Sequence, residues 1–310
     1  MRLPSQVTLR EVGPRDGLQV ERYLPTEQKI ALVNALSKTG LTCIEVTSFM
    51  HPKAMPNLAD AELVMAGIDR LPSITYSGMV PNARGAARAV ASRVDDMMFV
   101  FSASETANRR NVNMNVEESL RALEEILGMS RAAGVPVGVA IAMAFGCPFE
   151  GDVPAHRILD LVGRLSSLGV QAIDLADTTG MANPKQVYEL SCRVLDAFPR
   201  IQVGLHIHNT RGAGMANLLA GLLAGVTRFD GSIGGLGGCP FAVGATGNVP
   251  TEDVAHMLQE MGIDTGLDLG KLIACAQLAQ ELIGRELPGQ VMKAGVRGRL
   301  TALGVQGDAR

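Results

Sequence analysis

Cysteine is scarce and scattered in this sequence. The chain has five cysteines in 310 residues, an odd number, and no two of them form a CxxC pair. Neither a disulfide framework nor a structural zinc site is therefore expected to hold the fold together. We expect most of these cysteines to be small core residues, among them Cys192 and Cys275, which lie within helical patterns.

A strong charge of one sign and a long apolar run are also missing. The formal net charge is only -3, so the chain has no general basic surface to neutralise phosphates, and we expect no nucleic acid partner. The N-terminal segment lacks the apolar core of a signal peptide, and no later stretch reaches about 18 uninterrupted apolar residues. We therefore expect no membrane partner and a cytoplasmic location.

The sequence does contain a regular alternation of short, β-branched apolar runs and longer amphipathic segments. Eight runs are predicted to be strands, each followed by a helix. This order predicts an α/β protein built as a closed parallel (β/α)8 TIM barrel, with an open doubly wound sheet as the alternative. The predicted strands are Val7–Gly13, Cys43–Phe49, Ile74–Val80, Met97–Ser102, Val135–Gly146, Ala172–Ala176, Ile201–His208 and Arg228–Ile233.

Residues typical of helix ends agree with this order. Thr26 is predicted to begin the first helix, Gly134 to end the helix before the fifth strand, and Pro184 to lie in the first turn of the sixth helix. Thr251, followed by two acidic residues, is predicted to be an N-cap.

No low-complexity segment or linker divides the chain. We therefore expect residues 1–310 to form one catalytic domain. Its barrel is predicted to span about 5–262, and additional C-terminal helices about 263–300, including a helix over Asp268–Ile283.

A His-x-His pair stands at the end of the seventh predicted strand. Because alternate residues of a strand share a face, His206 and His208 are predicted to point the same way, into the barrel mouth. One interpretation is a pair of rim histidines without a ligand. Asp16 and Asn248, in other predicted βα loops, favour a metal site instead. Two imidazoles, a carboxylate and an amide oxygen suit an octahedral ion such as Mg²⁺ or Mn²⁺ better than a closed zinc site.

The neighbouring pair of Arg15 and Asp16 is ambiguous by itself, since such a pair is often a surface turn. Beside a metal the pair gains a function. Asp16 would be a ligand, and Arg15 would be a fixed cation near a developing enolate oxygen.

Residues 231–248 are rich in glycine, which predicts a mobile loop whose backbone can come close to a ligand. A phosphate cradle is the rival interpretation, although neither GxGxxG before a helix nor GxxxxGK[ST] is present. Cys239 lies at the centre of this segment. A thiol there is better placed for acid/base or nucleophilic chemistry than for packing.

Four motifs closely resemble those of the 3-hydroxy-3-methylglutaryl-CoA lyases, a family within a superfamily of metal-dependent TIM-barrel lyases and Claisen-type synthases. The resemblance runs through nearly the whole chain, and the glycine segment with its cysteine is specific to the lyase branch. The motifs are EVGPRDGLQ at 11–19, IEVTSF at 44–49, GLHIHNTR at 204–211 and GGLGGCPF at 234–241.

The resemblance implies cleavage of 3-hydroxy-3-methylglutaryl-CoA to acetyl-CoA and acetoacetate with Mg²⁺ or Mn²⁺. It implies that Arg15 stabilises the enolate, that Glu45 and Asp177 are active-site carboxylates, and that Cys239 helps to protonate the product. The implied metal ligands are Asp16, His206, His208 and Asn248. The sequence leaves both His206 and Asp16 open as the base that takes the hydroxyl proton.

Two alternatives remain at this level. One is a lyase for a related 3-hydroxyacyl-CoA, longer and branched or of the citramalyl type. The other is a Claisen-type synthase, although the synthases that share these motifs look longer and carry C-terminal regulatory domains.

Some residues depart from the family pattern or remain open. Arg22 stands where a lysine is common, and Phe241 where a tyrosine is common. Members of the family are commonly dimeric, so we expect a homodimer. The basic residues considered for contact with the CoA group are Arg22, Lys53, Arg109 and Arg110.

Overall fold

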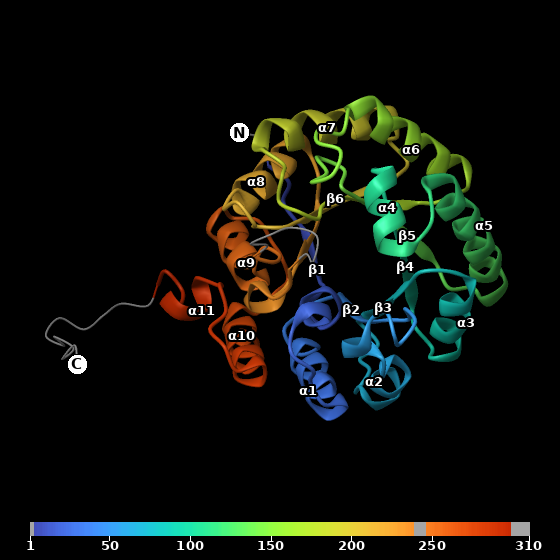
Figure 1. Ribbon diagram of the computed structural model, residues 1–310. Coiled ribbons are helices and arrows are strands. Elements are labelled where there is room, and N and C mark those ends of the chain that lie inside the picture. Colours follow the sequence, from blue (N-terminus) through green and yellow to red (C-terminus); the bar gives the residue numbers. More distant parts are fainter. Residues whose placement is uncertain (1–2, 239–245, 299–310) are drawn as a thin grey trace, which may run out of the picture.

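The computed structural model describes residues 3–238 and 246–298. Eight parallel strands close into a barrel, in which each strand pairs with the next and the last pairs with the first (Figure 1). The predicted barrel is confirmed, and the open-sheet alternative is wrong. The strands are β1 (Thr8–Glu11), β2 (Cys43–Ser48), β3 (Thr75–Val80), β4 (Asp96–Ser102), β5 (Val137–Ala142), β6 (Ala172–Asp177), β7 (Gln202–Ile207) and β8 (Arg228–Gly231).

The largest difference from the predicted strand ends is at β5. The prediction ran over Val135–Gly146, whereas the strand ends at Ala142. The next residue, Met143, has a φ of 57°, in the left-handed region that breaks a strand. The residues that follow are still buried, so their composition stays apolar. From composition alone a buried loop of this kind cannot be distinguished from a strand.

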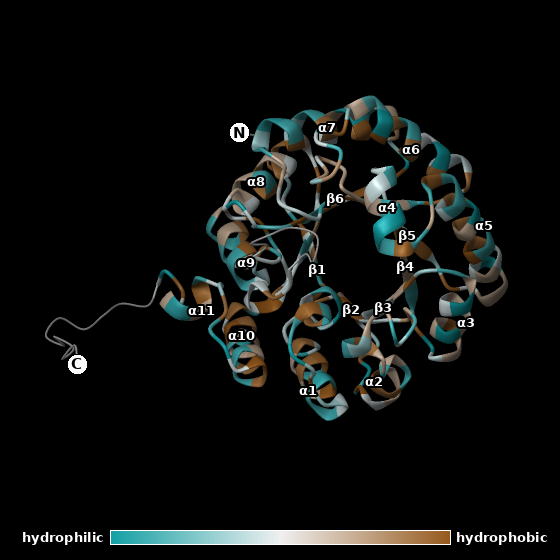
Figure 2. Cartoon of the chain, in the orientation of Figure 1, coloured by the Kyte–Doolittle hydropathy of each residue, from teal (hydrophilic) through white to brown (hydrophobic). Residues whose placement is uncertain are grey.

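Helices surround the barrel, and hydrophobic and hydrophilic residues alternate around most of them (Figure 2). Between β4 and α5 the chain inserts a short additional helix, α4, which lies inside the outer ring in Figure 1. The helices are α1 (Thr26–Leu36), α2 (Ala61–Gly67), α3 (Ala83–Ala91), α4 (Glu105–Val112), α5 (Val116–Ala133), α6 (Ala155–Ser167), α7 (Pro184–Ala197), α8 (Gly214–Ala224), α9 (Thr251–Glu260), α10 (Leu269–Ile283) and α11 (Val291–Ala294). No helix in the described part of the chain combines the length and the apolar character needed to cross a membrane.

The predicted helix ends are confirmed with one exception. Thr26 begins α1, Gly134 caps α5 with a φ of 69°, and Pro184 is the first residue of α7. Thr251 is not an N-cap: it is the first helical residue of α9, and Pro250 precedes it. Its hydroxyl instead donates to the carboxylate of Glu11 (2.6 Å), so tertiary contact prevails over capping at this position.

The C-terminal helices cover one side of the barrel. α10 begins after Asp268, as predicted, and packs against α1 and against the 3₁₀ turn Ile233–Gly235 that follows β8. α11 packs against α9 and α10. These contacts hold the start of the glycine-rich segment against the barrel.

Candidate metal centre and active site

A π-helical turn, Gly13–Gly17, follows β1 and carries two of the predicted site residues. The backbone N–H groups of Asp16 and Gly17 both donate to the carbonyl of Val12, at 2.7 Å and 3.3 Å, and all five residues of the turn are buried. π-Helical turns are rare in proteins overall, and those that occur are often at functional sites. Arg15 and Asp16 both line the cavity at the barrel mouth.

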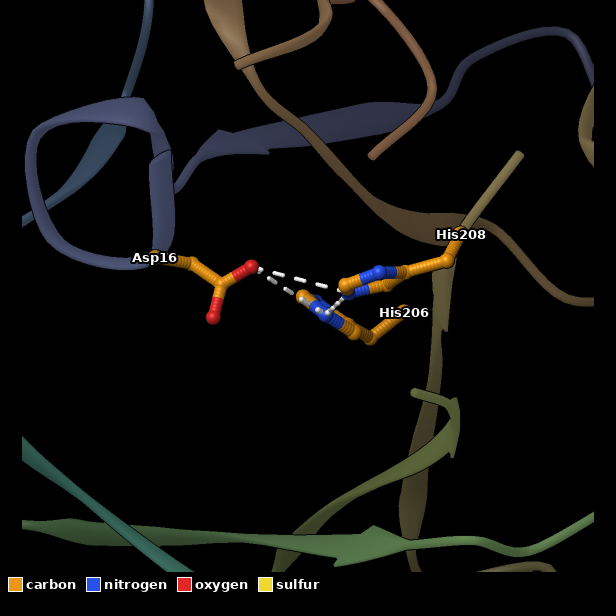
Figure 3. A group of neighbouring side chains, drawn as sticks. All are labelled: Asp16, His206 and His208. Atoms are coloured by element: carbon orange, nitrogen blue, oxygen red, sulfur yellow. Dashed lines mark hydrogen bonds and ion pairs between the residues drawn. The ribbon is translucent and has the colours of Figure 1, made fainter. Parts of the chain in front are cut away.

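Three predicted ligands converge at this mouth (Figure 3). The Nε2 atoms of His206 and His208 lie 3.0 Å apart, so the two imidazoles do share a face. Asp16 Oδ2 lies 3.6 Å from His208 Nε2 and 3.9 Å from His206 Nε2. All three side chains are buried. Residues from β7 and from the loop after β1 thus meet as one cluster.

The atoms of this cluster fit a bound divalent ion. Two imidazole nitrogens at 3.0 Å need a proton or a cation between their lone pairs. The same spacing separates adjacent ligands on an octahedral ion whose bonds are about 2.1 Å long. Asn248 Oδ1 is buried and has no hydrogen-bond partner among the described residues. A buried amide oxygen is normally hydrogen-bonded, so this unpaired atom beside the cluster also favours a cation there.

Asn248 is already attached to the cluster. Its Nδ2 donates to Asp16 Oδ2 (2.7 Å) and to the carbonyl of Leu236 (3.1 Å). The fourth predicted ligand is therefore in contact with Asp16 and pairs with His208 through an isolated backbone bridge, and it offers a free amide oxygen for a hard cation.

Electrostatics keep the cluster ready for a cation. Burial works to raise the pKa of Asp16, but the Arg15 guanidinium and the two imidazoles outweigh it and hold this pKa well below its usual range. Asp16 is therefore a carboxylate at any physiological pH, as a metal ligand must be.

Arg15 is fixed by two carboxylates. Its Nη1 donates to Asp16 (2.6 Å) and its Nη2 to Glu45 (2.9 Å). Its Nε is buried and has no partner among the described residues, and each terminal nitrogen uses one of its two hydrogens in these contacts. The predicted cation is thus held in place, lines the cavity and keeps N–H donors free.

Glu45 and Asp177 occupy different settings. Glu45 is fully buried and reaches the site only through Arg15. Asp177 accepts hydrogen bonds from the backbone N–H groups of Met181 (2.8 Å) and Ala182 (3.2 Å), and burial raises its pKa. Its carboxylate therefore holds the turn after β6, and the structure does not join it to the metal cluster.

The cavity at the mouth has a volume of about 350 Å³. The polar cluster from β1, β7 and β8 lines one part of it, and apolar residues of β3, β4 and β5 line another. Ala107 and Asn111 of α4 also line it, so the additional helix covers the opening. Five methionines contribute to the lining: Met50, Met55, Met79, Met98 and Met143. A concave site with one polar region and one apolar region suits a small organic ligand.

The described part of the glycine-rich segment is not a free loop, which corrects the prediction for residues 231–238. All eight of these residues are buried, because Ile233 and Gly234 donate their N–H groups to the carboxylates of Glu11 and Glu252. Gly237 has a φ of 122°, and a Cβ there would lie 2.7 Å from Asn248 Nδ2. Only glycine fits this approach.

Two predicted residues of this segment cannot be placed. Cys239 and Phe241 lie outside the described residues. Gly238, which precedes the cysteine, lines the cavity.

The four basic residues considered for CoA differ in their surroundings. Arg22 donates to the carbonyl of Leu282 (2.6 Å) near the end of α10, and Arg110 lies over the ring of Phe149 at 4.5 Å. Lys53 and Arg109 are exposed, and neither has an ion-pair partner among residues 3–238 and 246–298. These two remain available to an anionic group.

Three residues at the site escaped the sequence prediction. Gln19 donates to Asp16 Oδ1 (2.8 Å), Asp230 contacts His206 Nδ1 (2.9 Å), and Arg10 binds Asp230. For Arg10 and Asp230 the available signal was a charged residue within a predicted strand, where apolar residues are the rule. At Asp230 this signal was obscured by the glycine that follows, because an Asp-Gly pair is more typical of a turn.

Two buried carboxylates, Glu11 and Glu252, hold the chain after β8. Burial raises the pKa of Glu11 to about 7 and the pKa of Glu252 to about 8, and the charge of Asp253 adds to the latter shift. In the unfolded chain Glu252 loses its proton near its ordinary pKa of 4.5. Stability is therefore lost as the pH rises from about 4.5 through about 8.

We expect Glu252→Gln to remove much of this pH dependence, because glutamine keeps an acceptor for the N–H of Gly234 and carries no charge. Wild type and variant should have similar Tm values at pH 5. At pH 9 the variant should melt at least about 3 °C higher. Glu281→Gln, at an exposed position of α10, is the control. Parallel Tm curves for wild type and Glu252→Gln across this range would contradict the assignment.

The fold and the cluster together define a (β/α)8-barrel protein with a candidate metal centre at the carboxyl ends of its strands. The profile of the HMGL-like family matches residues 6–279. The hydroxymethylglutaryl-CoA lyase YngG of Bacillus subtilis is 44% identical over 94% of this chain and 97% of its own length. The mitochondrial hydroxymethylglutaryl-CoA lyase of Gallus gallus is 39% identical over 95% of this chain and 99% of its own length.

Solved structures agree with these sequence comparisons. An HMG-CoA lyase from Acinetobacter baumannii, in complex with coenzyme A and 3-methylmalate, superposes with a TM-score of 0.93 at 44% identity and covers 98% of this chain and 100% of its own. The chain therefore belongs to the HMGL-like family.

Proposed function

We propose that this protein is a divalent-metal-dependent carbon–carbon lyase that cleaves 3-hydroxy-3-methylglutaryl-CoA to acetyl-CoA and acetoacetate. The observation that carries the proposal is the convergence of Asp16, His206 and His208 on the cavity that Arg15 also lines. Relatives that match nearly the full length of the chain are lyases for this substrate.

The reaction requires an alkoxide and an enolate. The tertiary hydroxyl at C3 gives its proton to a base, for which His206 and Asp16 are the two candidates, the bond between C2 and C3 breaks, and C3 becomes the ketone of acetoacetate. The electron pair of the broken bond passes to C2 as the enolate of acetyl-CoA, which then takes up a proton. A Mg²⁺ or Mn²⁺ ion held at this site would supply the Lewis acidity that makes the hydroxyl easier to deprotonate.

The residues that would hold this ion are Asp16, His206, His208 and Asn248. An uncommitted N–H group of Arg15 is the donor proposed to face the enolate oxygen, because Asp16 and Glu45 engage only one hydrogen on each terminal nitrogen. Glu45 then acts on the reaction through the orientation of Arg15. For Asp177 the contacts favour a role in holding the turn after β6.

Cys239 is proposed as the acid that protonates the enolate, on the strength of its position directly after a residue that lines the cavity. We expect Cys239→Ser to bind Mn²⁺ and substrate like the wild type and to lower kcat by about 10²-fold or more, since the effect of a general acid is of that order. Steady-state kinetics and a Mn²⁺ titration on the same sample test this. A kcat close to that of the wild type would remove the thiol from the mechanism.

The remaining assignments concern the surroundings of the reaction. Lys53 and Arg109 are proposed to contact the phosphates of CoA, because both are exposed and they lie, respectively, next to Ala54 and two residues before Asn111, which line the cavity. We also propose that residues 1–310 form one catalytic domain, that two copies associate as a homodimer, and that the protein is cytoplasmic.

The proposal is tested by product analysis with a panel of acyl-CoA substrates. We expect 3-hydroxy-3-methylglutaryl-CoA to give acetoacetate and acetyl-CoA in equal amounts, with a higher kcat/KM than citramalyl-CoA or a longer 3-branched homologue. Preferred cleavage of one of the other thioesters would show that the assigned substrate is wrong and that the lyase reaction is correct. Condensation of acetyl-CoA with a 2-oxo acid, without any cleavage, would favour the synthase.

A further inference from the structure

A chain of buried charges lies behind His206, on the side away from the metal cluster. His206 Nδ1 is 2.9 Å from Asp230 Oδ2. Arg10 donates to both oxygens of Asp230, from Nε to Oδ1 (2.9 Å) and from Nη2 to Oδ2 (2.6 Å). Arg10 Nη2 also donates to Asp174 Oδ2 (2.7 Å). All four side chains are buried inside the barrel.

These contacts determine which nitrogen of His206 carries the proton. Asp230 Oδ2 can only accept, so Nδ1 must be the N–H donor of the ring. In the neutral ring, the form that binds a metal, Nε2 is then left with its lone pair, and this is the atom that faces His208 and Asp16. Arg10 holds both oxygens of Asp230, so the acceptor cannot rotate away from the ring.

We propose that Asp230, held in place by Arg10, is a positioning residue that fixes the tautomer and orientation of His206 for metal binding. The inference rests on the metal site of the proposed function and assigns to it residues that sequence reasoning missed. Partners of this kind raise metal affinity by about 10- to 100-fold when they orient a ligating histidine.

Asp174 provides a matched control inside the same network. It is as buried as Asp230 and binds the same nitrogen of Arg10, but it makes no contact with His206. Its side chain packs against the backbone of the neighbouring strand, since a Cβ on Gly204 would lie 2.0 Å from Asp174 Oδ1. If metal binding depends only on negative charge in the barrel interior, substitution of either aspartate should weaken it equally. If it depends on the orientation of His206, substitution of Asp230 alone should weaken it.

Asparagine cannot replace Asp230 without conflict. If its amide oxygen occupies the Oδ2 position, its NH₂ group faces the N–H of Arg10 Nε. In the opposite orientation the NH₂ group faces both His206 Nδ1–H and Arg10 Nη2. We therefore expect Asp230→Asn to weaken Mn²⁺ binding by about 10- to 100-fold and Asp174→Asn by less than about threefold.

The experiment measures Mn²⁺ binding by calorimetry on metal-stripped wild type, Asp230→Asn and Asp174→Asn, after thermal melts confirm that each variant is folded. Long-range ¹H–¹⁵N NMR spectra of ¹⁵N-histidine-labelled protein then report the tautomer. We expect an Nδ1–H signature for His206 in wild type and Asp174→Asn, and a smaller Nδ1–H population in Asp230→Asn, because one of the two amide orientations places an NH₂ group against Nδ1. Where Asp230→Asn does not fold, Asp230→Glu takes its place, because it retains the charge and displaces the acceptor by one methylene.

Equal weakening by the two asparagine variants, or an unchanged Mn²⁺ affinity and tautomer in Asp230→Asn, would overturn the inference. A wild type that binds Mn²⁺ tightly and yet fails to cleave 3-hydroxy-3-methylglutaryl-CoA would overturn the proposed substrate and leave the role of Asp230 intact. A wild type that binds no Mn²⁺ would overturn both.

Discussion

Replacing His206 by alanine is expected to abolish metal binding and turnover together while the barrel stays folded. The imidazole lies at the end of β7 and supplies one of the three ligand atoms that converge at the mouth. A bound divalent ion is worth several kcal/mol to a reaction that develops negative charge on oxygen, so we expect kcat to fall by at least about a thousandfold. Asp16→Ala should behave in the same way, because Asp16 supplies the carboxylate of the cluster.

The comparison that isolates the metal site is with His156→Ala. His156 is exposed near the start of α6 and lies outside the cluster. Circular dichroism, Mn²⁺ titration and steady-state kinetics on these variants separate the outcomes. A His206→Ala protein that unfolds globally, or one that retains wild-type turnover, would undermine the assignment of this residue as a ligand.

Arg15→Lys is the second substitution with a large expected effect. The guanidinium binds Asp16 and Glu45 at once and keeps further N–H donors free at the cavity that Arg15 lines. An ammonium group is a single point of charge on a flexible stem and cannot do all three. We expect kcat and kcat/KM to fall together by about 10²- to 10³-fold, the size of effect seen when one donor to a developing oxyanion is lost.

Lysine is the informative replacement because it keeps a positive charge between two buried carboxylates. Alanine would leave both of them unpaired, and the resulting loss of stability would obscure the kinetic effect. Mn²⁺ affinity measured on the same protein shows whether the cluster is intact. If Arg15→Lys retained kcat within about threefold of the wild type, the role of Arg15 toward the enolate would be wrong.

The sequence predicts most of the fold because the barrel's strands are short, apolar and separated by helices of strong periodicity. His206 and His208 were predictable since a strand has a period of two, and the conclusion that both face one side follows from that period alone. The end of β5 was missed because burial continues past Met143, where the backbone leaves the strand conformation.

The part of the site that escaped prediction consists of residues that act through other residues. No local sequence pattern links Asp230 to a predicted ligand. Its contact with His206 forms because β7 and β8 are adjacent in the barrel. Gln19 and Arg10 are of the same kind, since each reaches the cluster through Asp16 or Asp230. A sequence pattern shows which residues lie at the end of one strand. It does not show which side chains of neighbouring strands are in contact.

The most direct test of a metal-dependent lyase is an assay of acetoacetate release from 3-hydroxy-3-methylglutaryl-CoA by protein stripped of metal with EDTA. We expect no product from the stripped protein and full product once Mg²⁺ or Mn²⁺ is restored. Folded protein that releases acetoacetate equally well with and without the ion would contradict the metal centre. Folded protein that releases none with either ion would contradict the substrate.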